Sequence, residues 1–287
     1  MCRLFGLSAA PHRVRATFRL LEAPDGLAQH SRQEPAGTGL GVFGVDGTPM
    51  VDKQAACQDP QFARAAKERE SATFLAHLRY AATGGLEPRN THPFEQRGRL
   101  FAHNGVLADL PKLEAHLGDY RDLVIGDTDS ERFFALITQQ IDAHSGDVTA
   151  AITAAARWVA ENLPVYAINL ILTTPTELWA LRYPDTHDLF LLRRGPGGPH
   201  GDRRLEHAST AGGIRARSGA LSEYAAVVVA SERMDEDPGW QPLRPGELLH
   251  VDDHLTCMRR IIIAHPPRHP LTLDGLGVRA AASQAAS

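Results

Sequence analysis

The sequence predicts a single domain with a layered α+β fold. Strand-length apolar runs occur in both halves of the 287-residue chain, and two long helical patterns lie between them. No internal repeat and no Pro/Gly-rich linker separates the two halves. We therefore expect one domain over residues 1–265, followed by an extended, partly mobile tail over residues 266–287.

The first half of the chain carries clear local signals. The Asp46-Gly47 pair between two apolar runs predicts a tight hairpin, and Val14, Phe18 and Leu21 at helical spacing predict a short helix. The expected elements are a strand at 2–9, a helix at 12–22, a loop at 23–39, hairpin strands at 40–45 and 48–52, a charged helix at 60–70, strands at 73–80 and 99–103, and a long loop at 81–98. A loop of that length inside a compact domain is usually functional.

The second half begins with helices and continues with strands. Phe133, Ile137 and Ile141 mark the buried side of the first helix, and Asp147 or Thr149 is suited to cap the second. The expected elements are helices at 129–144 and 149–163, strands at 166–173, 177–183, 189–193, 224–231, 247–252 and 255–264, and a Gly/Pro loop at 194–202.

Composition and charge exclude several classes of protein. Hydrophobic residues make up 43% of the chain, enough for a full core. The formal net charge of −4 lacks the basic excess that binding to nucleic acid or to an anionic membrane surface requires. Three cysteines, Cys2, Cys57 and Cys257, give neither a disulfide framework nor a zinc-binding pair. We therefore expect a cytoplasmic protein without metal or cofactor, whose partners include neither nucleic acid nor membrane.

Cys2 has the most specific chemistry. Removal of Met1 would place a thiol and a free α-amine on one residue, with ordinary pKa values of about 8.5 and 7.7–8.0. The amine can then accept the thiol proton, so that nucleophile and base belong to the same residue. A small buried residue at the start of a strand is the alternative interpretation.

Three further patterns have both a structural and a chemical interpretation. Asn104-Gly105 after a strand indicates a turn, but an amide next to a backbone N–H also suits an oxyanion hole. Arg79 at a strand end forms a surface ion pair or grips a carboxylate. The stretch from Asp127 to Glu131 caps a helix, and a carboxylate there can also hold an ammonium group.

Together these patterns resemble one family, the class II glutamine amidotransferases, which are N-terminal-nucleophile hydrolases. Five motifs occur in order: Met1-Cys2 followed by Arg-Leu-Phe-Gly, Arg79-Tyr80-Ala81, Asn90-Thr91-His92-Pro93-Phe94, His103-Asn104-Gly105 and Asp127-Thr128-Asp129-Ser130-Glu131. The later Ser231-Glu232-Arg233-Met234 and Pro238-Gly239-Trp240 extend the likeness over most of the chain. The sequence looks most like the stand-alone branch, which includes γ-glutamyl amide hydrolases. The resemblance implies a four-layer αββα sandwich, with two stacked, mainly antiparallel sheets flanked by helices.

The resemblance also implies roles for individual residues. Cys2 would be the nucleophile, and Asn104 and Gly105 would hold the tetrahedral oxyanion. Arg79 would bind the α-carboxylate of a glutamyl group, and Asp129 its α-ammonium. The remaining substrate contacts would come from Tyr80, from His92 in the pocket wall, from Thr83, and from Asp127 as the weaker alternative to Asp129. Family members often have Arg-aromatic-Ala-Thr, but Ala82 stands at that threonine position here, with Thr83 one step along.

The function implied is hydrolysis of the γ-amide bond of glutamine or a γ-glutamyl compound through a Cys2 thioester. Two alternatives remain open: a glutaminase subunit that delivers ammonia to a separate synthase, and a non-catalytic binding module that retains Met1. The partners expected are the small-molecule substrate, a separate synthase, and a second copy of the chain in a homodimer.

Overall fold

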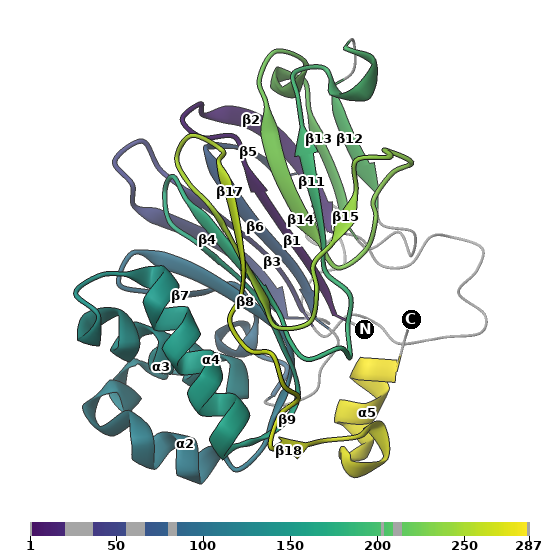
Figure 1. The fold of residues 1–287 in the computed structure, drawn as a ribbon. Helices are drawn as coiled ribbons and strands as arrows, with labels where there is room; N and C mark the ends of the chain where they lie inside the picture. Colours follow the sequence, from purple (N-terminus) through teal and green to yellow (C-terminus); the bar gives the residue numbers. More distant parts are fainter. Residues whose placement is uncertain are drawn as a thin grey trace.

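The computed structural model describes residues 2–20, 37–55, 67–79, 85–201, 204–208 and 214–285. Three β-sheets and a group of helices are stacked in layers in this part of the chain (Figure 1). The first sheet has the strand order β15 (Gln241–Pro242), β11 (Phe190–Arg194), β14 (Ala226–Ala230), β1 (Arg3–Ser8), β6 (Thr73–Arg79), β3 (Gly37–Phe43) and β4 (Pro49–Ala55).

The second sheet faces the first, and a third sheet covers the first from outside. The second sheet runs β17 (Cys257–Ile261), β16 (Glu247–Val251), β10 (Leu178–Arg182), β9 (Pro164–Thr173), β8 (Arg99–Leu107) and β7 (Phe94–Gln96), with β18 (His269–Pro270) parallel to β9. The third runs β12 (Leu205–Ala208), β13 (Ile214–Ser218), β2 (Val14–Leu20) and β5 (Lys67–Ser71). The other paired strands are antiparallel.

Helices cover the outer face of the second sheet. They are α2 (Leu110–Leu117), α3 (Asp129–Ala143) and α4 (Val148–Asn162), while α5 (Val278–Ala285) lies apart from them (Figure 1). Short 3₁₀ turns occur at Pro88–Asn90, Gly118–Leu123, Gly198–His200, Ala220–Ser222 and Leu273–Gly275. The α3–α4 pair packs on the sheet through aromatic contacts, with the rings of Phe101 and Phe134 stacked at 4.8 Å.

Side-chain alternation along β1 shows how the layers are joined. Leu4 points into the core between the two large sheets, whereas Phe5 and Leu7 point into the core beneath the third sheet. Gly6 lies where the large sheets approach closely, because a Cβ there would come 2.9 Å from Leu178 Cδ1. The first strand is therefore buried on both faces, and its first residues lie inside the sandwich.

The predicted α+β class with stacked antiparallel sheets is confirmed. The resemblance implies a layer of helices on the outer face of each large sheet. In the described residues, the third sheet lies on the outer face of the first sheet in place of helices. The helix predicted at 12–22 is wrong, because β2 occupies Val14–Leu20. Val14, Ala16 and Phe18 are all buried, which is the period of a strand, and the wider spacing of Val14 and Phe18 fits both periods.

Other differences are local. Within the predicted charged helix, Lys67–Ser71 is an edge strand, and residues 60–66 lie outside the described part. The loop predicted at 23–39 ends in β3, with residues 23–36 also outside the described part. Helix α2 was not anticipated. The segment predicted as an extended tail contains α5, because Ala280 and Gln284, four residues apart, are both buried on one side; the boundary at residue 265 stays a prediction.

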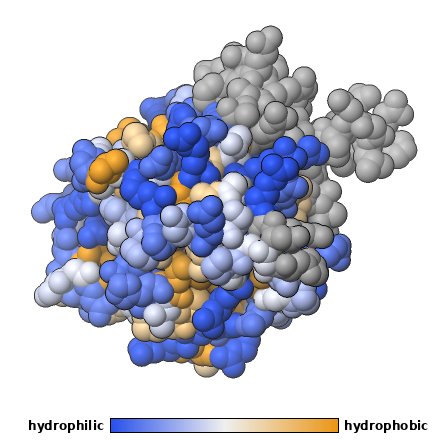
Figure 2. All heavy atoms as spheres, turned by 90° about the horizontal axis from the view of Figure 1, so that it is seen from above, coloured by the Kyte–Doolittle hydropathy of each residue, from blue (hydrophilic) through white to orange (hydrophobic). Residues whose placement is uncertain are grey.

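None of the helices in the described ranges is both long and apolar enough to cross a bilayer. On the face shown in Figure 2, hydrophilic residues predominate and apolar ones form small separate patches.

Candidate active site at the start of strand β1

Strand register places Cys2 beside Arg79. In the β1–β6 pairing Arg3 lies opposite Leu78, so the next position along brings Cys2 opposite Arg79. Both side chains are nearly inaccessible, with exposures of 6% for Cys2 and 4% for Arg79. The alternation of β6 turns Arg79 toward the second sheet, on the same side as Leu75. A buried guanidinium thus lies next to a buried thiol at the edge of the inter-sheet space.

Asn104 reaches the nucleophile from the opposite sheet. Its Nδ2 donates to the carbonyl oxygen of Cys2 at 3.3 Å, and its Oδ1 is buried without a hydrogen-bond partner. Because an amide nitrogen carries two hydrogens, one N–H remains to stabilise a negative oxygen near Cys2. The next residue, Gly105, must lack a side chain, since a Cβ there would overlap the Ala167 carbonyl.

Asp129 stands at the first turn of α3 and faces the end of β8. The helix begins with Thr128, whose hydroxyl accepts from the Glu131 N–H at 3.2 Å, as an N-cap does. The carboxylate of Asp129 is 2% exposed and accepts from the Leu107 N–H at 2.8 Å. These contacts hold one carboxylate oxygen in place, inside the same buried region as Arg79.

Asp127 points elsewhere. Its side chain is 56% exposed and binds Asn90 Nδ2 at 3.1 Å and Arg89 Nη2 at 3.5 Å. The same asparagine accepts from the Asp127 N–H, so this carboxylate secures the turn at Pro88–Asn90. Of the two predicted carboxylates, only Asp129 is placed within the buried cluster.

The charges of the cluster influence one another. Burial lowers the pKa of Arg79, while the nearby Cys2 and Asp129 act in the opposite direction. Burial also lowers the pKa of His103, against which the Asp129 carboxylate acts. Asp129 therefore exerts its field on both Arg79 and His103, and a substrate ammonium entering this region would meet an anion that is already desolvated.

His103 clamps α3 to the sheet. Its Nε2 lies 3.2 Å from the Ala167 carbonyl oxygen, which can only accept, so Nε2 carries the hydrogen. Its Nδ1 is then the acceptor for the Ser130 hydroxyl at 2.9 Å. Because Ser130 follows Asp129, this chain of hydrogen bonds fixes the turn that carries the carboxylate.

Two more histidines lie behind Arg79. The rings of His77 and His92 are 4.2 Å apart, and none of their ring nitrogens has a hydrogen-bond partner. Burial, followed by the neighbouring Arg79 and His103, lowers the pKa of His77 to about 3. Burial also holds the pKa of His92 well below its usual range. Both rings are therefore neutral near pH 7.

A row of glycines makes room for the segment that carries His92. Gly37, Gly39 and Gly41 alternate on the inner face of β3. A Cβ at Gly37 would lie 2.7 Å from Thr91 Oγ1, and one at Gly39 would overlap the His92 carbonyl. Since positions 37, 39 and 41 carry no side chain, the backbone of the segment lies directly on this part of the strand.

Lys53 holds the same segment from the neighbouring strand. Its Nζ donates to the carbonyl oxygens of Thr91 at 3.2 Å and Pro93 at 3.4 Å. Burial lowers the pKa of Lys53, and the Glu131 carboxylate acts against that shift. Lys53 therefore supports the pocket wall without belonging to its surface.

The start of β1 is anchored on its other side by β14 and the residues that follow it. Ser231 Oγ accepts from the Leu4 N–H at 2.9 Å, and the Ser231 N–H donates to the Leu4 carbonyl. One residue further, Glu232 pairs with Arg3 at 3.2 Å. This gives the Ser231-Glu232 motif of the sequence a structural role next to the nucleophile.

The structure brings together most of the site residues predicted from sequence. The five residues that lie together come from the start of β1, the end of β6, the second half of β8 and the first turn of α3: Cys2, Arg79, Asn104, Gly105 and Asp129. Behind them the His92 ring packs against that of His77, tilted by 49°. Tyr80 and Thr83 lie outside the described residues. His77 and Ser130 were missed as functional residues. Strand alternation two residues before Arg79 could have indicated His77, and the capping motif contains Ser130. Within the described ranges, no group of three or more His, Cys, Asp or Glu side chains is arranged to hold a metal ion.

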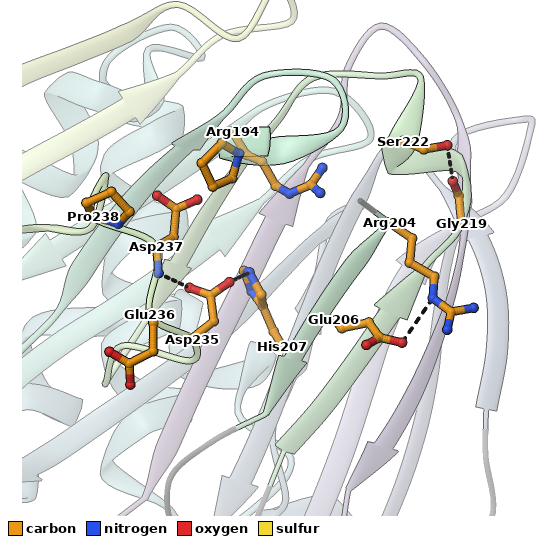
Figure 3. A pocket seen from close by; sticks show the side chains of 11 residues that line it. Arg194, Arg204, Glu206, His207, Gly219, Ser222, Asp235, Glu236, Asp237 and Pro238 are labelled. Atoms are coloured by element: carbon orange, nitrogen blue, oxygen red, sulfur yellow. Dashed lines mark hydrogen bonds and ion pairs between the residues drawn. The ribbon is translucent and has the colours of Figure 1, made fainter. Parts of the chain in front are cut away.

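A separate cavity lies away from Cys2, between the third sheet and the segment 235–238. Its volume is about 860 Å³, and charged side chains line much of it (Figure 3). Several of them are paired with each other: His207 Nε2 lies 3.0 Å from Asp235, and Arg204 lies 3.0 Å from Glu206. This cavity contains none of the residues predicted to perform chemistry.

Comparisons with known proteins agree with this geometry. The chain is 27% identical over 264 residues to YafJ of Escherichia coli K12, a protein named as a glutamine amidotransferase, with 86% of this chain and 96% of that protein covered. The crystal structure of a glutamine amidotransferase from Pseudomonas aeruginosa PA01 matches with a TM-score of 0.65 at 18% identity, covering 90% of this chain and 99% of the other. The glutamine phosphoribosylpyrophosphate amidotransferase of B. subtilis matches with a TM-score of 0.55 at 17% identity, over 92% of this chain and 50% of that chain.

The stacked sheets with a cysteine at the start of the central strand define an N-terminal-nucleophile amidotransferase fold, the fold of these structural neighbours. The family model for class-II glutamine amidotransferases matches residues 1–267, and the chain belongs to that family. The family resemblance noted in the sequence is thereby confirmed.

Proposed function

We propose that this protein hydrolyses the γ-amide bond of glutamine or of a γ-glutamyl compound, with Cys2 as the nucleophile once Met1 has been removed. The observation that supports this most directly is the convergence of Cys2, Arg79, Asn104 and Asp129 in one buried cluster. Its groups match the four needs of the reaction: a nucleophile, an oxyanion donor, a cation and an anion. Since the thiol must stay reduced, we place the protein in the cytoplasm.

Substrate binding uses the two fixed charges. The α-carboxylate of the glutamyl group pairs with Arg79 and its α-ammonium with Asp129, which leaves the γ-carbonyl facing Cys2. Two charge contacts at fixed positions convert binding energy into orientation of the reacting carbonyl. Both charged residues are buried, so water competes little for these contacts.

Acylation begins as the α-amine of Cys2 takes the thiol proton and the sulfur attacks the γ-carbonyl carbon. The carbonyl π electrons move onto oxygen, and this oxyanion accepts hydrogen bonds from Asn104 Nδ2 and the Gly105 backbone. As the tetrahedral intermediate collapses, the C–N bond breaks, the α-ammonium returns its proton to the leaving amine, and a thioester remains on Cys2.

Deacylation repeats these steps with water. The α-amine takes a proton from water while the hydroxide attacks the thioester carbon. The C–S bond breaks as the second intermediate collapses, the thiolate recovers the proton from the α-ammonium, and glutamate is released. The free α-amine is therefore required twice, and retention of Met1 would block both steps.

Intact mass spectrometry of the native protein, before and after 6-diazo-5-oxo-norleucine, tests this proposal. We expect loss of Met1 and a single covalent adduct that maps to Cys2. Arg79→Lys should slow labelling by this glutamine analogue more than labelling by iodoacetamide, which carries no glutamyl group. Retained Met1 with no adduct would contradict the proposal and favour a binding module.

A glutaminase subunit that supplies ammonia to a separate synthase is the second candidate. It is supported by the likeness to the B. subtilis amidotransferase, because this chain corresponds to only 50% of that chain. Glutamine turnover that rises on addition of a co-purified synthase would favour this candidate. Full turnover by the isolated protein, unchanged by such a partner, would favour hydrolysis.

A further inference from the structure

Helix α5 lies outside the family match, which ends at residue 267, yet it packs against β8 and β9. Ala280 is 8% exposed and joins a small apolar cluster with Val106, Tyr166 and Ala167. Figure 1 shows α5 beneath the ends of β8 and β9, at the edge of the molecule where β1 begins.

The cluster lies close to the proposed oxyanion donor. Val106 is two residues beyond Asn104 on β8, which is about 7 Å along a strand, and residues two apart point to the same face. Asn104 itself binds the Cys2 carbonyl. Helix α5 therefore covers the inner face of the second sheet just past the catalytic groups.

A buried polar contact fixes the position of α5. Gln284, 3% exposed, accepts from His187 Nε2 at 2.5 Å. The His187 carbonyl in turn accepts from Asn169 Nδ2 at 3.1 Å, and Asn169 pairs with Asn104 across β8 and β9. Burial lowers the pKa of His187, so its ring is neutral, and its Nδ1 is buried without a hydrogen-bond partner.

The strand order shows on which side of Cys2 this helix lies. In the first sheet Arg79 occupies β6, and beyond it lies β3. Strand β6 packs over β8 and β9, as β1 does, so the contact of α5 with these two strands does not decide its side. Its tie to His187 does, because His187 lies in the β10–β11 connection and β11 is on the opposite side of β1 from β6. Glutamyl-binding charges thus extend from Cys2 toward β6 and α3, and α5 lies in the opposite direction.

We propose that α5 and His187 form the wall of the leaving-group side, and that this wall selects γ-glutamyl amides whose leaving group is ammonia or a small uncharged primary amine. The proposal rests on the proposed hydrolase function. The described wall residues are short or neutral, and none carries a charge that would pair with a leaving amino acid. The free Nδ1 of His187 is an acceptor suited to the N–H of a departing amine.

The test compares glutamine with γ-glutamyl-p-nitroanilide, whose leaving group is an aromatic ring. Gln284→Ala cuts the tie to His187, and Val278→Ala on the same helix is the control, because Val278 is 88% exposed. We expect Gln284→Ala to raise the ratio of kcat/KM for the anilide over that for glutamine by about tenfold, while Val278→Ala leaves it unchanged. Alkylation of Cys2 by a bulky maleimide, relative to iodoacetamide and quantified by peptide mass spectrometry, should rise in parallel.

Two results would overturn the inference: an unchanged substrate ratio in Gln284→Ala, or equal losses with both substrates accompanied by a lower melting temperature. Absence of any glutamyl turnover in the unmodified protein would instead refute the proposed function. The Cys2 alkylation rates would still report in that case whether α5 shields the nucleophile.

Discussion

Two polar regions of this protein differ in how their charges are used. One region is the cavity of about 860 Å³ beside the segment 235–238. Here both carboxylate oxygens of Asp235 have partners within the protein, His207 Nε2 at 3.0 Å and Trp240 Nε1 at 2.7 Å. Around Cys2, the oxygen of the Asn104 amide and the rings of His77 and His92 have no hydrogen-bond partner. In the cavity His207 Nδ1 also lacks a hydrogen-bond partner, but around Cys2 several such groups lie together beside the proposed nucleophile. Buried polar groups normally find partners, so this cluster fits the ligand site that we propose.

The largest expected difference between the two regions appears when one group is removed from each. Cys2→Ala should lower glutamine hydrolysis by at least about 10⁴-fold, since the covalent route is lost. Asp235→Asn should stay within about twofold of the unmodified protein, because the cavity takes no part in the reaction. Steady-state kinetics with glutamine measures both. Comparable losses in the two variants would refute the distinction.

Removal of the amide next to Cys2 gives the next largest effect. Asn104→Ala should lower kcat by about 10²–10³-fold with a smaller change in KM, because an oxyanion donor acts mainly in the transition state. Asn162→Ala is a matched control, since the Asn162 side chain donates to the Trp158 carbonyl within its own helix. A change in KM alone would assign Asn104 to substrate binding instead.

The two acidic residues of the capping motif sharpen the comparison within the site. Asp129→Asn keeps an oxygen for the Leu107 N–H but loses the charge, and should lower kcat/KM by about 10²-fold. Asp127→Asn should change it by less than about threefold, because this side chain is half exposed and binds Arg89. The reverse order in a kinetic comparison would show that the exposed carboxylate holds the ammonium group.

The unpaired histidines should make the folded state sensitive to acid. The pKa of His77 is lowered to about 3 in the folded protein, so the unfolded chain binds the proton first as the pH falls below about 6.5. Stability should then decrease by up to about 1.4 kcal/mol per pH unit for this residue, and His92 adds to it in the same direction. Urea unfolding at pH 7, 6 and 5 measures the slope, which His77→Asn should reduce. An equal slope in that variant would mean that His77 is not the group that titrates.

The smallest effect concerns the cavity. Asp235→Asn should cost about 1–2 kcal/mol of stability, since the variant weakens the pairing with His207 and keeps the oxygen that Trp240 binds. Thermal unfolding at neutral pH measures this cost. A gain in stability would indicate that the ion pair between His207 and Asp235 stabilises the fold less than the neutral pairing that replaces it.

Sequence patterns predicted the strands and helices whose period was unambiguous. The Asp46-Gly47 hairpin and the two helices after residue 128 were confirmed because turn chemistry, caps and apolar spacing agree there. Strand β2 was missed because Val14 and Phe18 fit both a helix and a strand. Only its pairing with β13 and β5 within the third sheet, one face of which packs on the first sheet, decides between them.

The sequence identified most residues of the candidate site, but it did not show how they are arranged in space. Motif order identified Cys2, Arg79, Asn104 and the capping segment, but both Asp127 and Asp129 satisfied that motif. The choice depends on which carboxylate meets the end of β8, where Leu107 donates its N–H. That contact joins residues 22 apart in the chain and comes from packing of a helix on a sheet, which no local pattern encodes.

The glycines of β3 set the position of the segment that carries His92, so substituting them would shift this wall of the proposed pocket. The segment at 91–93 packs directly on the backbone of β3, so a side chain added at one of these glycines would push the segment away from the strand. An alanine Cβ at position 37 would lie 2.7 and 2.9 Å from the two branches of the Thr91 side chain and 3.1 Å from the Gln54 carbonyl oxygen, whereas one at position 39 would overlap the rigid carbonyl of His92 at 1.9 Å. A glycine-to-alanine substitution would therefore shift the 91–93 segment less at position 37 than at position 39. A protein engineer who wants to reshape the pocket without touching a catalytic group has a graded control in this strand.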